Sequence, residues 1–173
     1  RLWLEKVYAR GVPQLTVRAA LTGMLLGSVL GASNLYIGLK IGWNFGMSIT
    51  ASVLAFAIFS AVRKLFPSMD EFTMLENNTS QTAASAAAYM SSAGLVSSIP
   101  ALTMLRREHV IDVPELTHWQ LTAWLLAISV LGVVVAIPLK RSLINAEQLR
   151  FPSGIVCAET IRTMHAAGKE SLS

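Results

Sequence analysis

Four long stretches of the chain carry no charged residue, and short stretches that hold the charges separate them. They are Ala19–Leu39, Ile41–Val62, Asn77–Leu105 and Leu116–Leu139. A helix needs about 20 apolar residues to cross a bilayer, and because lipid satisfies no backbone polar group, a crossing segment must be helical. Three of the stretches are rich in Leu, Ile, Val, Phe and Trp and reach that length. They predict membrane-spanning helices; the alternative, a core helix of a soluble protein, is usually shorter and has a polar stripe.

The stretch Asn77–Leu105 differs in composition, because most residues from Thr79 to Ser98 are Ala, Ser, Thr or Gly. Small residues let neighbouring helices approach closely, and their hydroxyls offer hydrogen bonds between helices. Gly94 and Pro100 interrupt the second half of the stretch. We therefore predict a helix inside a bundle, either complete or broken and re-entrant; a soluble Ala-rich helix is the alternative.

Together these patterns predict an all-α fold, a polytopic transmembrane helix bundle with three or four spanning segments. The expected segments are a cytoplasmic N-terminal segment (1–18), a transmembrane hairpin (19–62), a cytoplasmic loop (63–76), a small-residue-rich buried or re-entrant helix (77–105), a polar loop (106–117), a transmembrane helix (118–139), and a cytoplasmic loop with an amphipathic helix (140–173).

Composition supports this picture, since 53% of the 173 residues are hydrophobic and 14% are charged. Soluble domains usually devote about a quarter of their residues to charge. So much apolar surface excludes a disordered chain, and the single cysteine, Cys157, excludes a disulfide framework. We interpret Cys157 as a buried thiol.

The positions of Lys and Arg predict the orientation. With the N-terminus inside and four crossings, the three outer cations are Lys40, Arg106 and Arg107, and the other eleven lie inside. Both ends are therefore expected in the cytoplasm, although a re-entrant third stretch would invert the later topology. The net charge of +4 reflects this bias, and no nucleic-acid partner is expected, because no basic cluster is interleaved with aromatic residues.

Two rows of glycines repeat at intervals of four residues, which places each row on one helix face. Inside an apolar run this spacing predicts close helix packing, and for the first row packing is a sufficient role. The two rows are Gly23, Gly27 and Gly31, and Gly38, Gly42 and Gly46.

Polar residues within Asn34–Gly46 have two interpretations. Lys40 could extend to the lipid headgroups while Tyr36 lies in the interfacial aromatic belt. Alternatively, Asn34, Lys40 and Asn44 could face a water-filled cavity, where an intramembrane charge usually serves a substrate or ion pathway. Both interpretations remain open.

The run Glu76–Thr82 reads ENNTSQT and precedes the small-residue helix. One interpretation is helix capping, because Asn, Ser and Thr cap well and an acid is favoured near a helix N-terminus. The other is that the exposed helix end and its amides bind an anionic group of a substrate. Further on, Glu159 and Arg162 are three residues apart and can pair on the helix surface, or Glu159 could line a pathway or carry a proton.

Three stretches carry a resemblance to a known family: GASNLYIGLKIGWNFG at Gly31–Gly46, LENNTSQTAASAAAY at Leu75–Tyr89 and EQLRFPSGIVCAE at Glu147–Glu159. Their order and separation resemble the oligopeptide transporter (OPT) family, in its prokaryotic, yellow-stripe-like branch. The resemblance implies an N-terminal piece of a larger secondary transporter in a bacterial inner membrane. It also implies uptake of small peptides or metal chelates coupled to protons, with no other cofactor, and with the remaining transmembrane helices as partners.

We expect a set of polar residues to line the transport path, with Lys40 pairing a substrate carboxylate or a nearby acid. The set is Asn34, Tyr36, Lys40, Asn44, Glu76, Asn77, Gln81, Thr82 and Glu159. No catalytic residue or metal ligand is expected, because enzyme motifs are absent and His109, His118 and His165 are scattered. The alternatives are a non-transporting membrane subunit or scaffold protein, and a membrane-embedded enzyme.

Overall fold

The computed structural model describes residues 13–112 and 114–170, and this part of the chain is helical without any strand. It therefore confirms the predicted all-α class. A single 3-10 turn (Met90–Ser92) follows α4, and a π-helical segment (Lys140–Ala146) continues α6. The α-helices are α2 (Val17–Ile41), α3 (Ser48–Leu65), α4 (Met74–Tyr89), α5 (Ser98–Arg107), α6 (His118–Leu139) and α7 (Pro152–Glu170).

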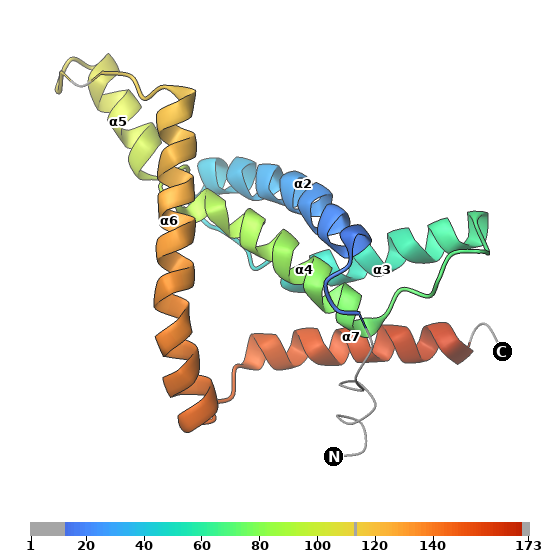
Figure 1. Ribbon diagram of the computed structural model, residues 1–173. Coiled ribbons are helices and arrows are strands. Elements are labelled where there is room, and N and C mark those ends of the chain that lie inside the picture. The colour runs from blue at the N-terminus through green and yellow to red at the C-terminus, as the bar shows by residue number, and fades with distance from the viewer. Residues whose placement is uncertain (1–12, 113, 171–173) are drawn as a thin grey trace.

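Helices α2, α3 and α4 form the packed part of the molecule, and α7 contacts both α3 and α4 (Figure 1). α2 lies alongside α4, and α7 crosses beneath them in the view of Figure 1. The buried apolar residues that join the first three helices are small or aliphatic for the most part, among them Leu26, Leu30, Ala51, Ala55 and Ala84. Small side chains fill much of this core, so its helices can approach one another closely.

Glycines in α2 make the close approach to α4 possible. A Cβ atom added at Gly23 would lie 2.8 Å from the Cβ of Ala83, and one at Gly27 would lie 2.8 Å from the Cβ of Ala87. Real Cβ atoms do not approach so closely, so a larger residue would force the helices apart. At Gly31 the nearest α4 atom would be 3.5 Å away, which is an ordinary contact.

Local signals in the sequence set several helix ends. The Thr16 side chain accepts a hydrogen bond from the backbone N–H of Ala19 at the start of α2. That helix ends at Gly42, whose φ of 70° is a left-handed conformation that glycine adopts without strain. Pro152 occupies the first position of α7, where its missing N–H costs no helical hydrogen bond.

Three helices are long and apolar enough to cross a membrane: Val17–Ile41, Ser48–Leu65 and His118–Ala146. The third is the most apolar, and each residue from His118 to Leu139 is exposed or half-buried in the structure. α6 lies beside the segment that follows α4, where the Trp124 Nε1 donates to the backbone carbonyl of Ala93 at 2.8 Å (Figure 1). A helix that is apolar on all sides suits lipid or further transmembrane helices. The chain is therefore an integral membrane protein.

The small-residue stretch contains two helices. α4 begins at Met74, before the expected boundary at Asn77, and ends at Tyr89. Gly94 follows with a φ of 95°, and α5 then begins at Ser98. The helix is thus broken near Gly94; whether the stretch crosses the membrane or re-enters stays a prediction.

Candidate functional site

A cavity of about 280 Å³ lies where the start of α3, the middle of α4 and the start of α7 meet. Its lining combines hydroxyl, amide and glycine positions with few apolar side chains, and it includes residues from all three stretches that carry the family resemblance. The lining residues are Gly46, Ser48, Ile49, Asn78, Gln81, Tyr89, Ser153, Gly154, Cys157 and Ala158.

Gln81 brings to the wall of this cavity an amide oxygen without a hydrogen-bond partner in the part of the chain that the structure describes. Its Nε2 donates to the Oδ1 of Asn78 at 3.0 Å and to the hydroxyl of Thr82 at 3.1 Å. Its Oε1 is buried and has no hydrogen-bond partner among the described residues. A buried acceptor left without a partner costs about 1–3 kcal/mol, so a hydrogen bond from a ligand or water to this oxygen would be favourable.

Hydroxyl groups and one glycine complete the polar wall of the cavity. The hydroxyls of Ser48 and Ser85 are 2.9 Å apart, which links α3 to α4 beside Gln81. A Cβ atom added at Gly46 would come within 2.9 Å of the Tyr89 hydroxyl, so a larger residue there would displace that hydroxyl from its present position.

Glu76 lies away from this cavity, in the first turn of α4, and is fully buried. Arg18 donates to both of its carboxylate oxygens, from Nε at 2.7 Å and from an Nη atom at 2.6 Å. The Thr16 hydroxyl and the Thr73 backbone N–H also donate to it. Burial alone would raise the pKa of the Glu76 carboxyl, but hydrogen bonds from Arg18, Thr16 and Thr73 outweigh it and hold the pKa below its ordinary value.

Asn34 is also fully buried and joins three parts of the chain. Its Nδ2 donates to the carbonyls of Phe45 at 3.2 Å and Ala88 at 3.3 Å, and its Oδ1 accepts from the Phe45 N–H at 3.0 Å. Nearby, Asn44 donates to the hydroxyl of Ser92 at 2.8 Å. Both asparagines therefore connect the reversal between α2 and α3 to the end of α4.

The other predicted path residues are dispersed. Tyr36 and Lys40 are exposed near the end of α2, with the Lys40 Nζ 6.0 Å from the centre of the Tyr36 ring. Glu159 is exposed on α7 and pairs with Arg162 at 3.2 Å. Thr82 is exposed beside Gln81, and its hydroxyl donates to the backbone carbonyl of residue 78 at 2.7 Å. Their assignment to a transport path stays a prediction.

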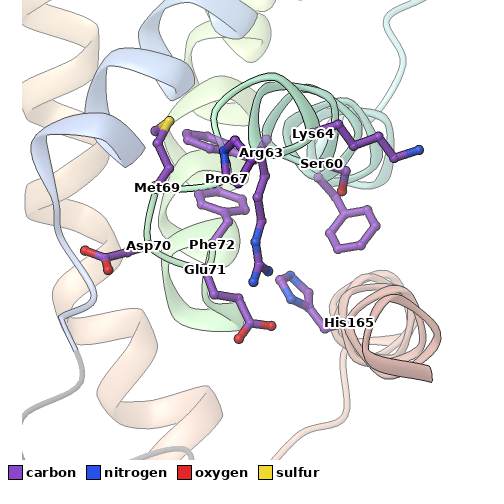
Figure 2. Close-up of a pocket in the computed structure, with 11 residues that line it drawn as sticks. Ser60, Arg63, Lys64, Pro67, Met69, Asp70, Glu71, Phe72 and His165 are labelled. Carbon is purple, nitrogen blue, oxygen red and sulfur yellow. The ribbon is translucent and has the colours of Figure 1, made fainter. Parts of the chain in front are cut away.

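Asn77 is fully buried, and its Nδ2 is 3.4 Å from the Nε2 of His165 on α7. His165 lines a second, larger cavity of about 530 Å³ between α3, the α3–α4 connection and α7. Figure 2 shows the His165 ring facing the guanidinium of Arg63 and the carboxylate of Glu71, while Asp70 points away. Sequence reasoning had interpreted His165 as one of several scattered histidines.

Sequence reasoning also did not select Ser48, Ser153 and Gly154, which line the smaller cavity. Ser153 and Gly154 belong to the Phe-Pro-Ser-Gly run within the third stretch of the family resemblance. That run was an available signal, whereas the position of Ser48 has no distinguishing pattern in the sequence. Among the described residues, no group of three or more His, Cys, Asp or Glu could hold a metal ion.

The model of the OPT oligopeptide transporter protein family matches residues 14–173 of the chain. The chain belongs to the OPT family. The three sequence stretches at residues 31–46, 75–89 and 147–159 had indicated this family, and that prediction is confirmed. In this OPT chain each of the three stretches contributes residues to the smaller cavity.

Curated relatives of the OPT chain come from fungi, bacteria and plants. Proteins of Saccharomyces cerevisiae and Haemophilus influenzae, both named "Putative oligopeptide transporter", are 33% identical over 88% of the chain and 34% identical over 79% of it. The metal-nicotianamine transporter YSL2 of Arabidopsis thaliana is 29% identical over 89% of the chain. These alignments cover 22%, 19% and 25% of the respective relatives, so the OPT chain spans a quarter of their length or less. No solved structure matches the chain significantly.

Proposed function

We propose that the chain is part of a secondary active transporter that moves small oligopeptides or metal-chelate complexes across the membrane, coupled to protons. Membership of the OPT family supports this proposal, as do the names of the relatives, which include oligopeptide and metal-nicotianamine transporters. The proposed location is a bacterial inner membrane with the N-terminus in the cytoplasm, in agreement with the distribution of Lys and Arg.

The observation that carries the proposal is the smaller cavity with the buried Gln81 carbonyl. Peptides and amino-acid-derived chelators present N–H donors and carboxylates. The Gln81 Oε1 can accept from such an N–H, and the hydroxyls of Ser48 and Tyr89 can donate to a carboxylate. Polar side chains that converge on one cavity between helices are the usual form of a transporter's substrate site.

Uptake by the reconstituted full-length protein tests the proposal. Proteoliposomes with an inward proton gradient should accumulate a labelled tripeptide or iron–nicotianamine, and a proton-collapsing ionophore should stop it. Gln81→Leu should lower the apparent affinity for that substrate about tenfold or more, since it removes a buried hydrogen bond of about 1.5 kcal/mol. The matched control is Gln14→Leu, the same substitution at an exposed position, which should transport normally.

A non-transporting membrane subunit is the second candidate function. The glycine contacts between α2 and α4 favour it, because Gly23 and Gly27 act there through packing alone. The two candidates differ in one result: a structural subunit moves neither substrate at any gradient. Absence of uptake for both the tripeptide and the chelate would therefore contradict the transport proposal.

A further inference from the structure

Three buried polar atoms within one turn of α4 have no hydrogen-bond partner in the described part of the chain: the Oδ1 of Asn77, the Oγ of Ser80 and the Oε1 of Gln81. We call these residues the α4 polar cluster. Their side chains are at most 8% exposed. Each such atom would cost about 1–3 kcal/mol in a dry interior. Buried waters usually satisfy such groups, so the α4 polar cluster offers three oxygens to which water could bind.

The two end residues of the α4 polar cluster are next to different cavities. At one end, Asn77 contacts His165, which lines the larger cavity. At the other end, Gln81 lines the smaller cavity. Asn77 and Gln81 are four residues apart, which corresponds to about 6 Å along a helix. One or two water molecules can therefore bridge the interval, and the cluster supplies the oxygens that would hold them.

His165 is the titratable side chain where the α4 polar cluster meets the larger cavity. It is 6% exposed, and its ring lies edge-on to Phe56 with centroids 4.9 Å apart. The charged residues that line the same cavity are Arg63 and Lys64 from α3 and Asp70 and Glu71 from the following connection. Figure 2 shows that Arg63 and Glu71 are directed toward the ring. The ring therefore lies near side chains of opposite charge.

We propose that His165 and the α4 polar cluster form a proton path between the two cavities, which deepens the proposed function and rests on it. A hydronium ion in the larger cavity gives a proton to the unprotonated ring nitrogen of neutral His165, which leaves a water and an imidazolium. The imidazolium then gives the proton of its other ring nitrogen to a water held by the α4 polar cluster, and the hydronium formed there passes a proton into the smaller cavity. One proton has crossed, His165 is neutral in its other tautomer, and a turn of the ring restores the starting tautomer.

Asn77 suits both states of the ring. In the present arrangement its Nδ2 faces the Nε2 of His165 and can donate to that nitrogen when the nitrogen carries no hydrogen. An imidazolium has two N–H donors, and a rotation of the amide would turn the Asn77 Oδ1 toward the ring as an acceptor. The amide therefore accepts either protonation state without a net loss of hydrogen bonds.

The test separates proton-driven accumulation from exchange of labelled for unlabelled substrate at equal pH, which needs no net proton movement. In proteoliposomes of the full-length protein, His165→Gln should lower proton-driven accumulation about tenfold or more and remove its pH dependence. Exchange should stay within about twofold of the wild type. Ser80→Ala provides a milder variant, because its hydroxyl holds no protein partner in the described structure and the fold should tolerate its loss. It should slow accumulation and leave exchange unchanged.

Thr163→Ala, on the exposed side of α7, is the control and should behave as wild type in both assays. The proton path is contradicted if His165→Gln keeps wild-type accumulation and pH dependence. It is equally contradicted if His165→Gln and Ser80→Ala lower exchange as much as accumulation, since that result assigns them a structural role. A wild-type protein that neither accumulates nor exchanges a tripeptide or iron–nicotianamine refutes the proposed function itself, and the proton path with it.

Discussion

Arg18 and Glu76 form a bidentate ion pair that joins the first turn of α2 to the first turn of α4. The Arg18 Nε is 2.7 Å from one carboxylate oxygen, and one of its Nη atoms is 2.6 Å from the other. The Glu76 side chain is fully buried, whereas that of Arg18 keeps 27% of its surface exposed. The guanidinium also donates to the backbone carbonyls of Asp70 and Glu71. This pair therefore fixes the end of the α2–α4 contact and the connection that precedes α4.

We predict that Glu76→Gln lowers the free energy of unfolding by about 3 kcal/mol, the lower end of the range for breaking a buried ion pair. The substitution leaves the Arg18 guanidinium without its counter-charge, and the partial exposure of Arg18 limits the cost. Denaturant unfolding of the detergent-solubilised full-length protein measures the change.

Glu115→Gln is the control for that substitution. Glu115 is exposed and lies 3.4 Å from Arg106, so its loss should cost less than about 1 kcal/mol. Equal stability of Glu76→Gln and wild type would show that Glu76 has no structural role, and its predicted place in a transport path would then regain weight.

The same carboxylate should make stability depend on acid pH. The pKa of Glu76 in the folded protein lies below its ordinary value of 4.5. The folded state therefore binds fewer protons than the unfolded state in this range. The contribution of the Glu76 carboxylate to the free energy of unfolding is fully present above the unfolded-state pKa. It is lost as the pH falls through the folded-state pKa. Unfolding midpoints measured from pH 6 downward should decrease less in Glu76→Gln than in the wild type; parallel curves would contradict the assignment.

Hydropathy located three long apolar helices, because the bilayer imposes a length and a composition that a single sequence displays. The capping box of Thr73 and Glu76 at the start of α4 is likewise a local pattern, because it involves residues three positions apart. Arg18 could not be assigned to Glu76 in this way. The two residues are 58 positions apart and meet through the packing of α2 on α4, which no local spacing encodes.

In the candidate site, too, residues within a local pattern could be selected from the sequence, whereas residues that depend on tertiary packing could not. Gln81 was selected from the sequence because its run of amides and hydroxyls stands at the start of the small-residue helix, where such groups can bind an anionic group. His165 was not selected, because its importance depends on α7 folding back against α3 and α4. Asn34 was selected as an intramembrane polar residue, and the structure shows three hydrogen bonds that hold the backbone. A sequence cannot show whether a buried amide will face protein or ligand.

The glycines of α2 should differ in their tolerance of alanine. An added Cβ at Gly27 would lie 2.8 Å from the Cβ of Ala87 and 3.1 Å from the Cα of Ala84. Forcing the helices apart typically costs about 1–3 kcal/mol, which exceeds the gain of about 1 kcal/mol from helix propensity. Gly27→Ala should therefore destabilise the protein.

Gly31→Ala is the matched variant, since its added Cβ would meet α4 at 3.5 Å. It should be neutral or raise the stability by up to about 1 kcal/mol. Thermal unfolding of both variants in the same detergent distinguishes them. If Gly27→Ala proved as stable as Gly31→Ala, the close α2–α4 contact would not exist in the membrane.

Lys40 offers a prediction that separates its two interpretations. Its ammonium group is exposed at the end of α2, 6.0 Å from the centre of the Tyr36 ring. If Lys40 belongs to the transport path, we expect this group to pair with a substrate carboxylate or a nearby acid. A charge-assisted hydrogen bond contributes about 1.5–3 kcal/mol, so Lys40→Ala should weaken uptake by the full-length protein roughly 10- to 100-fold. Membrane insertion should stay normal, and Lys40→Arg should restore part of the uptake because it restores the charge. Lys140→Ala, at the exposed start of the segment that continues α6, controls for the general loss of a cation. A side chain that serves only to reach lipid headgroups would leave uptake at the wild-type level after Lys40→Ala, and that result would remove Lys40 from the transport path.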